Sequence, residues 1–224
     1  YGCEGYFLNN IDDRICVHGP QDGDFSTEIC CFDIETTGLK VAHDAITEIG
    51  AVILKDGEIV DTFQTFVDPE RRLSPEIIGL TGITDDMLRG APKLEDALHA
   101  FLAFAGGRPL AAHNAEFDIS FIRAGCKKCG IPFEPTYLDS LIFAQNLLPE
   151  LGKYKLDIVA DHLQLPQFNH HRASDDAVPV AQMLAKFFVM LEERGVTHLQ
   201  QINDEMTKLR PLGVKRNRFP KHIF

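Results

Sequence analysis

Acidic side chains at two-residue spacing predict a metal centre near the end of a buried strand. Asp33 and Glu35 close the run 29–35, which is apolar until its end. In a β-strand, residues two apart project from the same face, so we expect both carboxylates to lie side by side. Two adjacent anions at such a place repel each other and lose hydration. Bound divalent cations would compensate for both effects.

A third carboxylate, Asp118, opens a predicted helix over residues 118–129. The apolar face of that helix continues through Phe121, Ile122 and Gly125. A carboxylate at the head of an apolar stripe is either an ordinary helix-start acid or a functional group directed into the fold. The position alone leaves both interpretations open.

The chain ahead of the longest predicted helix offers two histidine–aspartate pairs with the same spacing. They are His170 with Asp175 and His171 with Asp176. On a helical wheel, Asp176 shares a face with apolar residues, whereas Asp175 shares one with polar residues. Asp176 is therefore expected to point inward, and His171 is the histidine able to reach the same site. Pro179 implies either that the helix begins close to Asp175 or that it kinks.

The elements that must position these groups follow from periodicity and turn residues. Strands are predicted over residues 29–35, 45–54, 59–67, 109–113 and 137–138. Helices are predicted over residues 74–80, 85–88, 94–104, 118–129, 139–147, 155–163 and 174–193. Strands that first form hairpins and then alternate with helices predict an α/β fold, with a mixed sheet covered on both faces.

The composition excludes several classes of protein. The 224 residues, 45% of them hydrophobic, support one sizeable core. The sequence contains neither an apolar run near the roughly 18 residues of a membrane span nor a secretory signal pattern. Six cysteines, including the adjacent Cys30 and Cys31, fit reduced thiols in a cytoplasmic protein. A net charge of −11 argues against a general nucleic-acid coat protein, but not against an enzyme that holds a strand end through bound cations.

Four motifs resemble, in order, those of the DnaQ-like exonucleases of the DEDDh subclass. They are FDIETTGL at residues 32–39, LTGIT at 80–84, HNAEFD at 113–118 and HRASDDA at 171–177. Four separate motifs in the right order are far more specific than any one of them. The resemblance implies an RNase H-like fold, a three-layer α/β/α arrangement with a mixed five-stranded sheet.

The resemblance also implies roles for individual residues. The carboxylates expected to bind two Mg²⁺ or Mn²⁺ ions are Asp33, Glu35, Asp118 and Asp176. Carboxylate oxygens suit these hard cations better than Zn²⁺. His171 is expected to act as the general base. The residues expected to hold the terminal nucleotide or to line the path of the strand are Thr36, Thr37, Gly38, Leu80, Thr81, His113, Asn114 and Phe117.

Two longer segments narrow the resemblance to the exonuclease domain of PolC-type DNA polymerase III. They are DGEIVDTFQTFVDP and LSPEIIGLTGITDDML. In that family the exonuclease interrupts a PHP domain, and residues 4–10 and 215–224 look like the two edges of the interruption. The implied organisation is an N-terminal flank over residues 1–28, an exonuclease domain over residues 29–195, and a C-terminal helix with a basic flank over residues 196–224.

The function implied is a 3′→5′ exonuclease of the bacterial cytoplasm. It would release nucleoside 5′-monophosphates from single-stranded or frayed DNA 3′ ends, as the proofreading part of a parent chain with polymerase and PHP domains. A DEDDh exoribonuclease, such as an oligoribonuclease or a tRNA-trimming enzyme, would have the same catalytic core. The preference for DNA rests on the PolC-like flanks. A non-catalytic docking module would have lost a carboxylate or the histidine, and this sequence retains them all.

Overall fold

The computed structural model describes residues 14–20, 22–166 and 173–209 of the chain. Six strands of this part form one mixed sheet in the order β1-β6-β5-β2-β3-β4. They are β1 (Val17–His18), β2 (Ile29–Thr36), β3 (Ile46–Lys55), β4 (Glu58–Phe66), β5 (Leu110–Ala112) and β6 (Tyr137–Asp139). Strands β2, β3 and β4 are antiparallel neighbours, β5 and β6 run parallel to β2, and β1 is antiparallel to β6.

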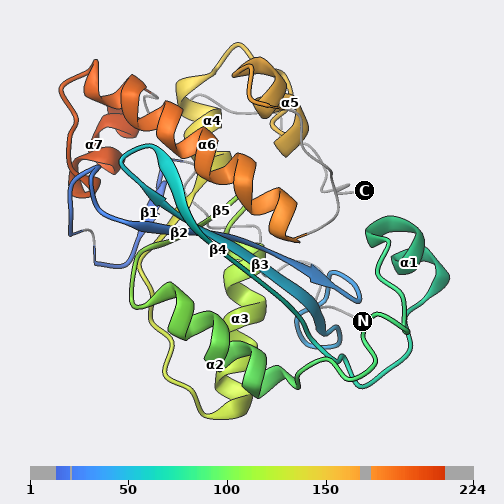
Figure 1. Cartoon of the computed structure of the whole chain (residues 1–224). Coiled ribbons are helices and arrows are strands. Elements are labelled where there is room, and N and C mark those ends of the chain that lie inside the picture. The colour runs from blue at the N-terminus through green and yellow to red at the C-terminus, as the bar shows by residue number, and fades with distance from the viewer. Residues whose placement is uncertain (1–13, 21, 167–172, 210–224) are drawn as a thin grey trace, which may run out of the picture.

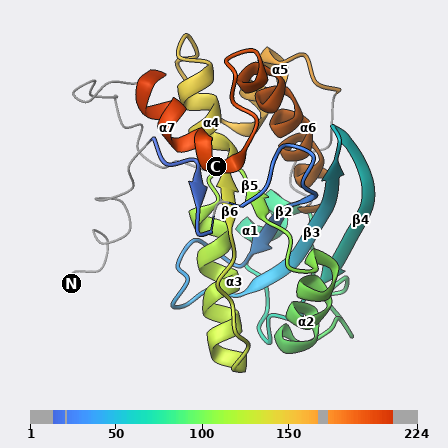
Figure 2. The same ribbon diagram turned by 90° about the vertical axis from the view of Figure 1, so that its left-hand side faces the viewer.

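Helices lie on both faces of this sheet and at one of its ends. They are α1 (Pro75–Thr81), α2 (Leu94–Ala105), α3 (Glu116–Cys129), α4 (Ser140–Leu147), α5 (Leu156–His162), α6 (Ala173–Glu192) and α7 (Leu199–Leu209). Helices α2 and α3 lie on one face, and α4, α5, α6 and α7 lie on the other (Figure 1, Figure 2). The predicted three-layer α/β fold is confirmed, and β1 adds a sixth strand to the five expected. In the part of the chain described, every helix is too short or too polar to cross a membrane.

Strand β2 is central, and its two faces enter different hydrophobic clusters. Ile29 and Cys31 pack with residues of α4, α6 and α7, whereas Phe32 packs with residues of α2 and α3. This burial on both faces explains why the run is apolar at almost every position. Asp33 and Glu35 continue the row of Ile29 and Cys31. Both carboxylates therefore lie on the face that α6 covers.

Parts of both predicted flanks are joined to this core. The side chain of Asn203 in α7 accepts hydrogen bonds from the backbone N–H groups of Cys16 and Val17, at 2.9 and 3.0 Å. It also donates to the carbonyl of Val17 at 2.8 Å. Leu199 and Ile202, on the same helix, are buried in the cluster beneath α6. Strand β1 and helix α7 therefore complete the sheet and one of its two cores.

Helix α1 stands at the end of the sheet where β2 ends, near the beginning of α6 (Figure 1). Its ends follow the sequence: Ser74 caps the first turn by accepting from the N–H of Ile77, and Gly82 ends the helix at φ 69°. The helix predicted over residues 85–88 is wrong, because residues 85–90 form turns. A helix needs several residues beyond its costly first turn, and Gly90, at φ 79°, stops this one at once.

Candidate active site

Three carboxylates from β2 and α6 converge above the end of the sheet. One oxygen each of Asp33, Glu35 and Asp176 can be chosen so that all three lie within 4.8 Å of one another. Asp33 and Glu35 are half-buried, and Asp176 is 8% exposed. Helix α6 starts at Ala173, ahead of Asp175, and continues through Pro179. Its first turns therefore bring Asp176 over the strand that carries the other two groups.

Asp118 approaches the same strand from the other side. It lies in the first turn of α3, which begins at Glu116, two residues earlier than predicted. Its side chain is 2% exposed, and its Oδ1 accepts a hydrogen bond of 3.2 Å from the backbone N–H of Ile34. Ile34 separates Asp33 from Glu35 in the sequence. This bond therefore fixes Asp118 beside the other carboxylates.

Burial and repulsion raise the pKa of two of these carboxyl groups. The pKa of Asp33 is well above its usual value, first through loss of hydration and then through four surrounding carboxylates: Asp118, Asp176, Glu35 and Glu48. Burial is also the main cause that raises the pKa of Asp118, although the hydrogen bond from Ile34 opposes it. Oxygen ligands of high negative charge are what hard divalent cations require, so the cluster fits such a cation.

Glu48 of β3 is a fifth carboxylate at this place, and the sequence analysis missed it. It lies opposite Glu35 in the β2–β3 ladder and is fully buried. One of its oxygens accepts a hydrogen bond from the side chain of Gln64, and the other accepts one of 3.3 Å from the backbone N–H of Ala173. The signal available was a glutamate inside an apolar strand, since acidic residues are almost never fully buried without partners.

The predicted general base, His171, lies outside the described residues, as does His170. Of the two aspartates that follow them, Asp176 is buried and Asp175 is half-buried. Asp176, and not Asp175, belongs to the carboxylate cluster.

At the end of β2 and in the loop that follows it, the threonines predicted to bind substrate form hydrogen bonds within the same segment. The hydroxyl of Thr36 donates to the carbonyl of Gly38 at 2.6 Å. The hydroxyl of Thr37 donates to Asp44 at 3.3 Å and accepts from the N–H of Ala45 at 3.0 Å. A Cβ on Gly38 would lie 2.6 Å from a carboxylate oxygen of Asp44, so only glycine fits without a shift. These side chains define the shape of the loop.

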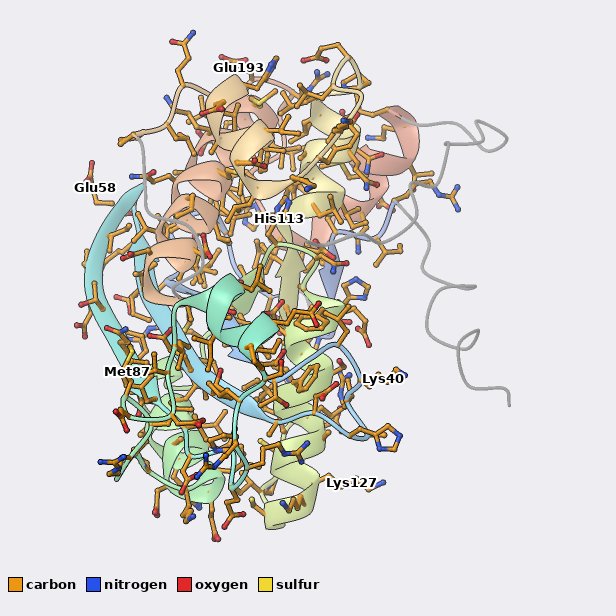
Figure 3. The ribbon with its side chains drawn as sticks, turned by 90° about the vertical axis from the view of Figure 1, so that its right-hand side faces the viewer. Lys40, Glu58, Met87, His113, Lys127 and Glu193 are labelled. Carbon is orange, nitrogen blue, oxygen red and sulfur yellow. The ribbon has the colours of Figure 1, made fainter. Side chains whose placement is uncertain are left out.

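Helix α1 carries the next two predicted substrate contacts. Thr81 is 3% exposed, and its hydroxyl donates to the carbonyl of Ile77 and accepts from the N–H of Ile83. Leu80, its neighbour, is half-buried. Figure 3 shows α1 in the foreground, with the loop of Lys40 to one side and His113 above the helix.

His113 follows β5 and is neutral, because burial lowers its pKa to about 4. Its Nε2 lies 2.8 Å from the carbonyl oxygen of Tyr154, and its Nδ1 lies 2.9 Å from the hydroxyl of Ser140. A carbonyl only accepts, so we assign the single ring proton to Nε2. Ser140 then donates to Nδ1 in preference to the carbonyl of Ala112, 3.2 Å away. His113 thus ties the start of α3 to the segment after α4.

Asn114 and Phe117 lie in the turn that starts α3. Asn114 adopts a left-handed conformation at φ 67°, and its N–H donates to Oδ1 of Asp139 at 3.0 Å. The same oxygen accepts from the N–H of Leu141 at 3.0 Å and so caps α4. Burial raises the pKa of Asp139 to about 6, although backbone N–H groups oppose that shift. Phe117 is half-buried, and its ring packs against Phe121 at a centroid distance of 5.1 Å.

Carboxylates from the end of β2 and from the first turns of α3 and α6 thus gather at one place. Such an arrangement is suited to metal-dependent hydrolysis. The family model described as Exonuclease (RNase_T) matches residues 30–184, more than half of the chain. The chain therefore belongs to this exonuclease family.

Two curated relatives narrow the comparison to one kind of polymerase. DNA polymerase III PolC-type of Caldanaerobacter subterraneus subsp. tengcongensis is 43% identical over 217 residues, covering 96% of this chain and 15% of the relative. The protein of the same name from Clostridium perfringens is 42% identical over 206 residues, covering 92% of this chain and 14% of the relative. The chain thus spans a small part of these relatives. The predicted resemblance to their family is confirmed.

Solved structures show the same fold. A structure of Exonuclease X in complex with 5′-overhanging duplex DNA has a TM-score of 0.61 at 27% identity, covering 80% of this chain and 98% of that one. A structure of E. coli Exonuclease I with a dA16 oligonucleotide has a TM-score of 0.64 at 15% identity, covering 75% of this chain and 42% of that one. The latter likeness concerns the fold alone. The predicted RNase H-like fold is confirmed.

Proposed function

We propose that this chain is a 3′→5′ exonuclease that releases nucleoside 5′-monophosphates from single-stranded or frayed DNA ends, as the proofreading part of a PolC-type polymerase. The observation that carries the proposal is the convergence of Asp33, Glu35 and Asp176 within 4.8 Å in a chain of the exonuclease family. The polymerase relatives and the DNA complex of Exonuclease X support DNA as the substrate. Polymerase and PHP domains of a parent chain would be the partners, in the bacterial cytoplasm.

The four carboxylates of the motifs would hold two cations, Mg²⁺ or Mn²⁺, because the donors are all carboxylate oxygens. When bound, such cations neutralise charge on a phosphodiester and lower the pKa of water. Asp33 and Glu35 would supply ligands from one face of β2, and Asp176 from α6. The Ile34 N–H holds Asp118 in place before any cation arrives, so that part of the ligand geometry is already fixed.

His171 would be the general base that accepts a proton from the attacking water. In the sequence it precedes Ala173, the first described residue of the helix that carries Asp176, by two positions. General-base catalysis typically contributes about 10²–10⁴-fold to a rate. His113 is unsuited to this role, because both of its ring nitrogens are engaged and its pKa is about 4.

The loop after β2, the end of α1 and the turn before α3 would surround the terminal nucleotide. The hydroxyls of Thr36, Thr37 and Thr81 are already bonded within their own segments. We infer that they shape the binding surface, and that direct contacts come from the main chain, Leu80 and Phe117. An aromatic ring stacks on any base, and an aliphatic side chain packs against a base without reading its edge, which suits an enzyme that must remove every nucleotide.

The test is cleavage of a 5′-labelled single-stranded DNA oligomer with Mg²⁺, Mn²⁺ or EDTA. We expect a ladder that shortens from the 3′ end and disappears with EDTA or in Asp33→Ala. Asp61→Ala, which removes an exposed aspartate of β4, is the matched control and should cleave normally. If the protein cleaved the matching RNA oligomer and not the DNA oligomer, we would assign it to the exoribonucleases. Folded protein that cleaves neither strand would be a non-catalytic module.

A further inference from the structure

Glu48 connects three elements of the fold at the carboxylate cluster. It belongs to β3, receives a hydrogen bond from Gln64 of β4, and accepts the backbone N–H of Ala173 in the first turn of α6. The first N–H groups of a helix have no partner within the helix, so an outside acceptor is needed when that end is buried. A carboxylate is well suited there, because the helix N-terminus carries partial positive charge.

The position of Glu48 explains why this contact matters for the site. Glu48 is the cross-strand neighbour of Glu35, so its side chain emerges on the same face of the sheet. Ala173 begins the helix that carries Asp176 three residues later. The distance between β2 and the first turn of α6 therefore determines where Asp176 stands relative to Asp33 and Glu35. Glu48 contributes to that distance through its hydrogen bond from Ala173, and Gln64 donates to the other oxygen of Glu48.

We propose that Glu48 is a positioning residue of the active site, which sets the first turn of α6 and with it the carboxylate of Asp176. Its oxygens accept from Gln64 and Ala173 and so are directed to these donors. It acts through Asp176 and is assigned no contact with substrate or cation. The inference rests on the proposed function, because Asp176 needs exact placement only if it binds a cation.

Three variants distinguish a positioning role of Glu48 from an effect of its negative charge. Glu48→Ala removes the hydrogen bonds from Gln64 and from the Ala173 N–H, together with the charge. Glu48→Gln removes the charge and keeps a single acceptor oxygen, for which Gln64 and the Ala173 N–H compete. Gln64→Ala removes one donor to Glu48 while leaving the Ala173 N–H in place, changes no charge, and alters an exposed side chain. Glu58→Gln, an exposed glutamate at the start of β4, is the control (Figure 3).

Two measurements report position without relying on catalysis. The first is the Mn²⁺ dissociation constant, from electron paramagnetic resonance titration. The second is amide hydrogen exchange of residues 173–178 in metal-free protein. Loss of a partner that orients a metal ligand typically weakens metal affinity by about 10–100-fold, which is the effect expected for Glu48→Ala. Gln64→Ala should weaken Mn²⁺ binding several-fold and accelerate exchange in the first turn of α6. Glu58→Gln should change neither.

The proposal is overturned if folded Glu48→Ala and Gln64→Ala keep wild-type Mn²⁺ affinity and wild-type exchange in α6. It is also overturned if Glu48→Ala weakens Mn²⁺ binding while Gln64→Ala and the exchange rates stay unchanged, because charge alone would then explain the effect. If Glu48→Ala fails to fold, the Mn²⁺ affinity of Gln64→Ala and the amide hydrogen exchange of Gln64→Ala and Glu48→Gln take its place. Wild-type values for both measurements would overturn the proposal. A wild-type protein that neither binds Mn²⁺ nor cleaves DNA would instead refute the proposed function.

Discussion

Asp118 and Ile34 are joined by a hydrogen bond of 3.2 Å from the backbone N–H of Ile34 to the carboxylate of Asp118. The contact connects the first turn of α3 to the central strand at the residue between Asp33 and Glu35. One side chain therefore serves two purposes: it satisfies a buried N–H of β2 and it brings a negative charge to the site.

Substitutions at Asp118 should separate these two purposes. Asp118→Asn keeps an oxygen for the Ile34 N–H and removes the charge, whereas Asp118→Ala leaves a buried donor unsatisfied. Such a loss costs about 1–3 kcal/mol. Both variants should lose activity, and urea unfolding in EDTA should find Asp118→Ala less stable than Asp118→Asn by that amount. Equal free energies of unfolding would show that the hydrogen bond contributes nothing.

The raised pKa of Asp33 predicts how the stability of metal-free protein depends on pH. A carboxyl whose pKa is raised by folding binds its proton more tightly in the native state than in the unfolded chain. Its contribution to stability is complete below the unfolded pKa of about 3.9 and is lost as pH rises through the folded value. The contribution of Asp33 to the stability of the metal-free protein should thus fall as pH rises above about 4. Asp33→Asn should show a shallower loss and should be more stable than wild type at pH 8, measured by urea unfolding in EDTA.

Mn²⁺ should reverse this destabilisation in wild type. At a hundredfold excess over its dissociation constant, a ligand that binds only the native state adds about 2.7 kcal/mol. The melting temperature of Asp33→Asn should respond far less to the same addition. A wild-type melting temperature that is unchanged by Mn²⁺ would contradict the assignment of the site.

The neighbouring aspartates of α6 form a matched pair. Asp176→Asn removes a charge from the carboxylate cluster and should abolish most of the activity, while Asp175→Asn should leave cleavage and Mn²⁺ affinity close to wild type. The measurement is the rate of removal of the 3′ nucleotide at saturating Mn²⁺, together with the Mn²⁺ dissociation constant. The reverse order of effects would exchange the roles of the two residues.

His113 should be a structural residue and not a general base. His113→Ala loses the bonds to Tyr154 and Ser140, so we expect a free energy of unfolding lower by about 1–3 kcal/mol. Because folding lowers the pKa of His113 to about 4, its contribution is full above the unfolded pKa of about 6.5 and is lost as pH falls toward 4. The difference between variant and wild type should shrink over that range. His99→Ala, which alters an exposed histidine of α2, should leave stability unchanged at every pH.

The periodicity of apolar residues was sufficient to predict most of the fold. It was also sufficient to choose Asp176 over Asp175 as the residue that points inward. The apolar stripe of α6 separated Asp176 from Asp175, because the two sides of that helix meet different surroundings. The same kind of reasoning placed Asp33 and Glu35 on one face of β2. These predictions depend on local geometry, which the sequence determines directly. The roles of the carboxylates as metal ligands, of the substrate-binding residues and of His171 stay predictions.

Other features depend on partners distant in the chain. Glu48 lay within a predicted strand, yet its hydrogen bond to Ala173 joins residues 125 positions apart. Asp139 was expected only to start a helix, and its bond to Asn114 depends on the alignment of β5 with β6. The flank before β2 gave no strand signal, because β1 has only two residues and pairs with β6. Periodicity cannot identify contacts of this kind.

Pro179 divides α6 into a short first segment and a longer second one, and the first is less stabilised by hydrogen bonds within the helix. A proline has no N–H, so the carbonyl of Asp175 cannot receive the bond that a continuous helix would supply from position 179. The first turn of α6 therefore depends on contacts with the sheet, such as the hydrogen bond from Ala173 to Glu48, more than the rest of the helix does. Local unfolding of that turn should require less free energy than unfolding of the rest of α6. We therefore expect the segment that carries Asp176 to open and re-form more readily than the body of the helix.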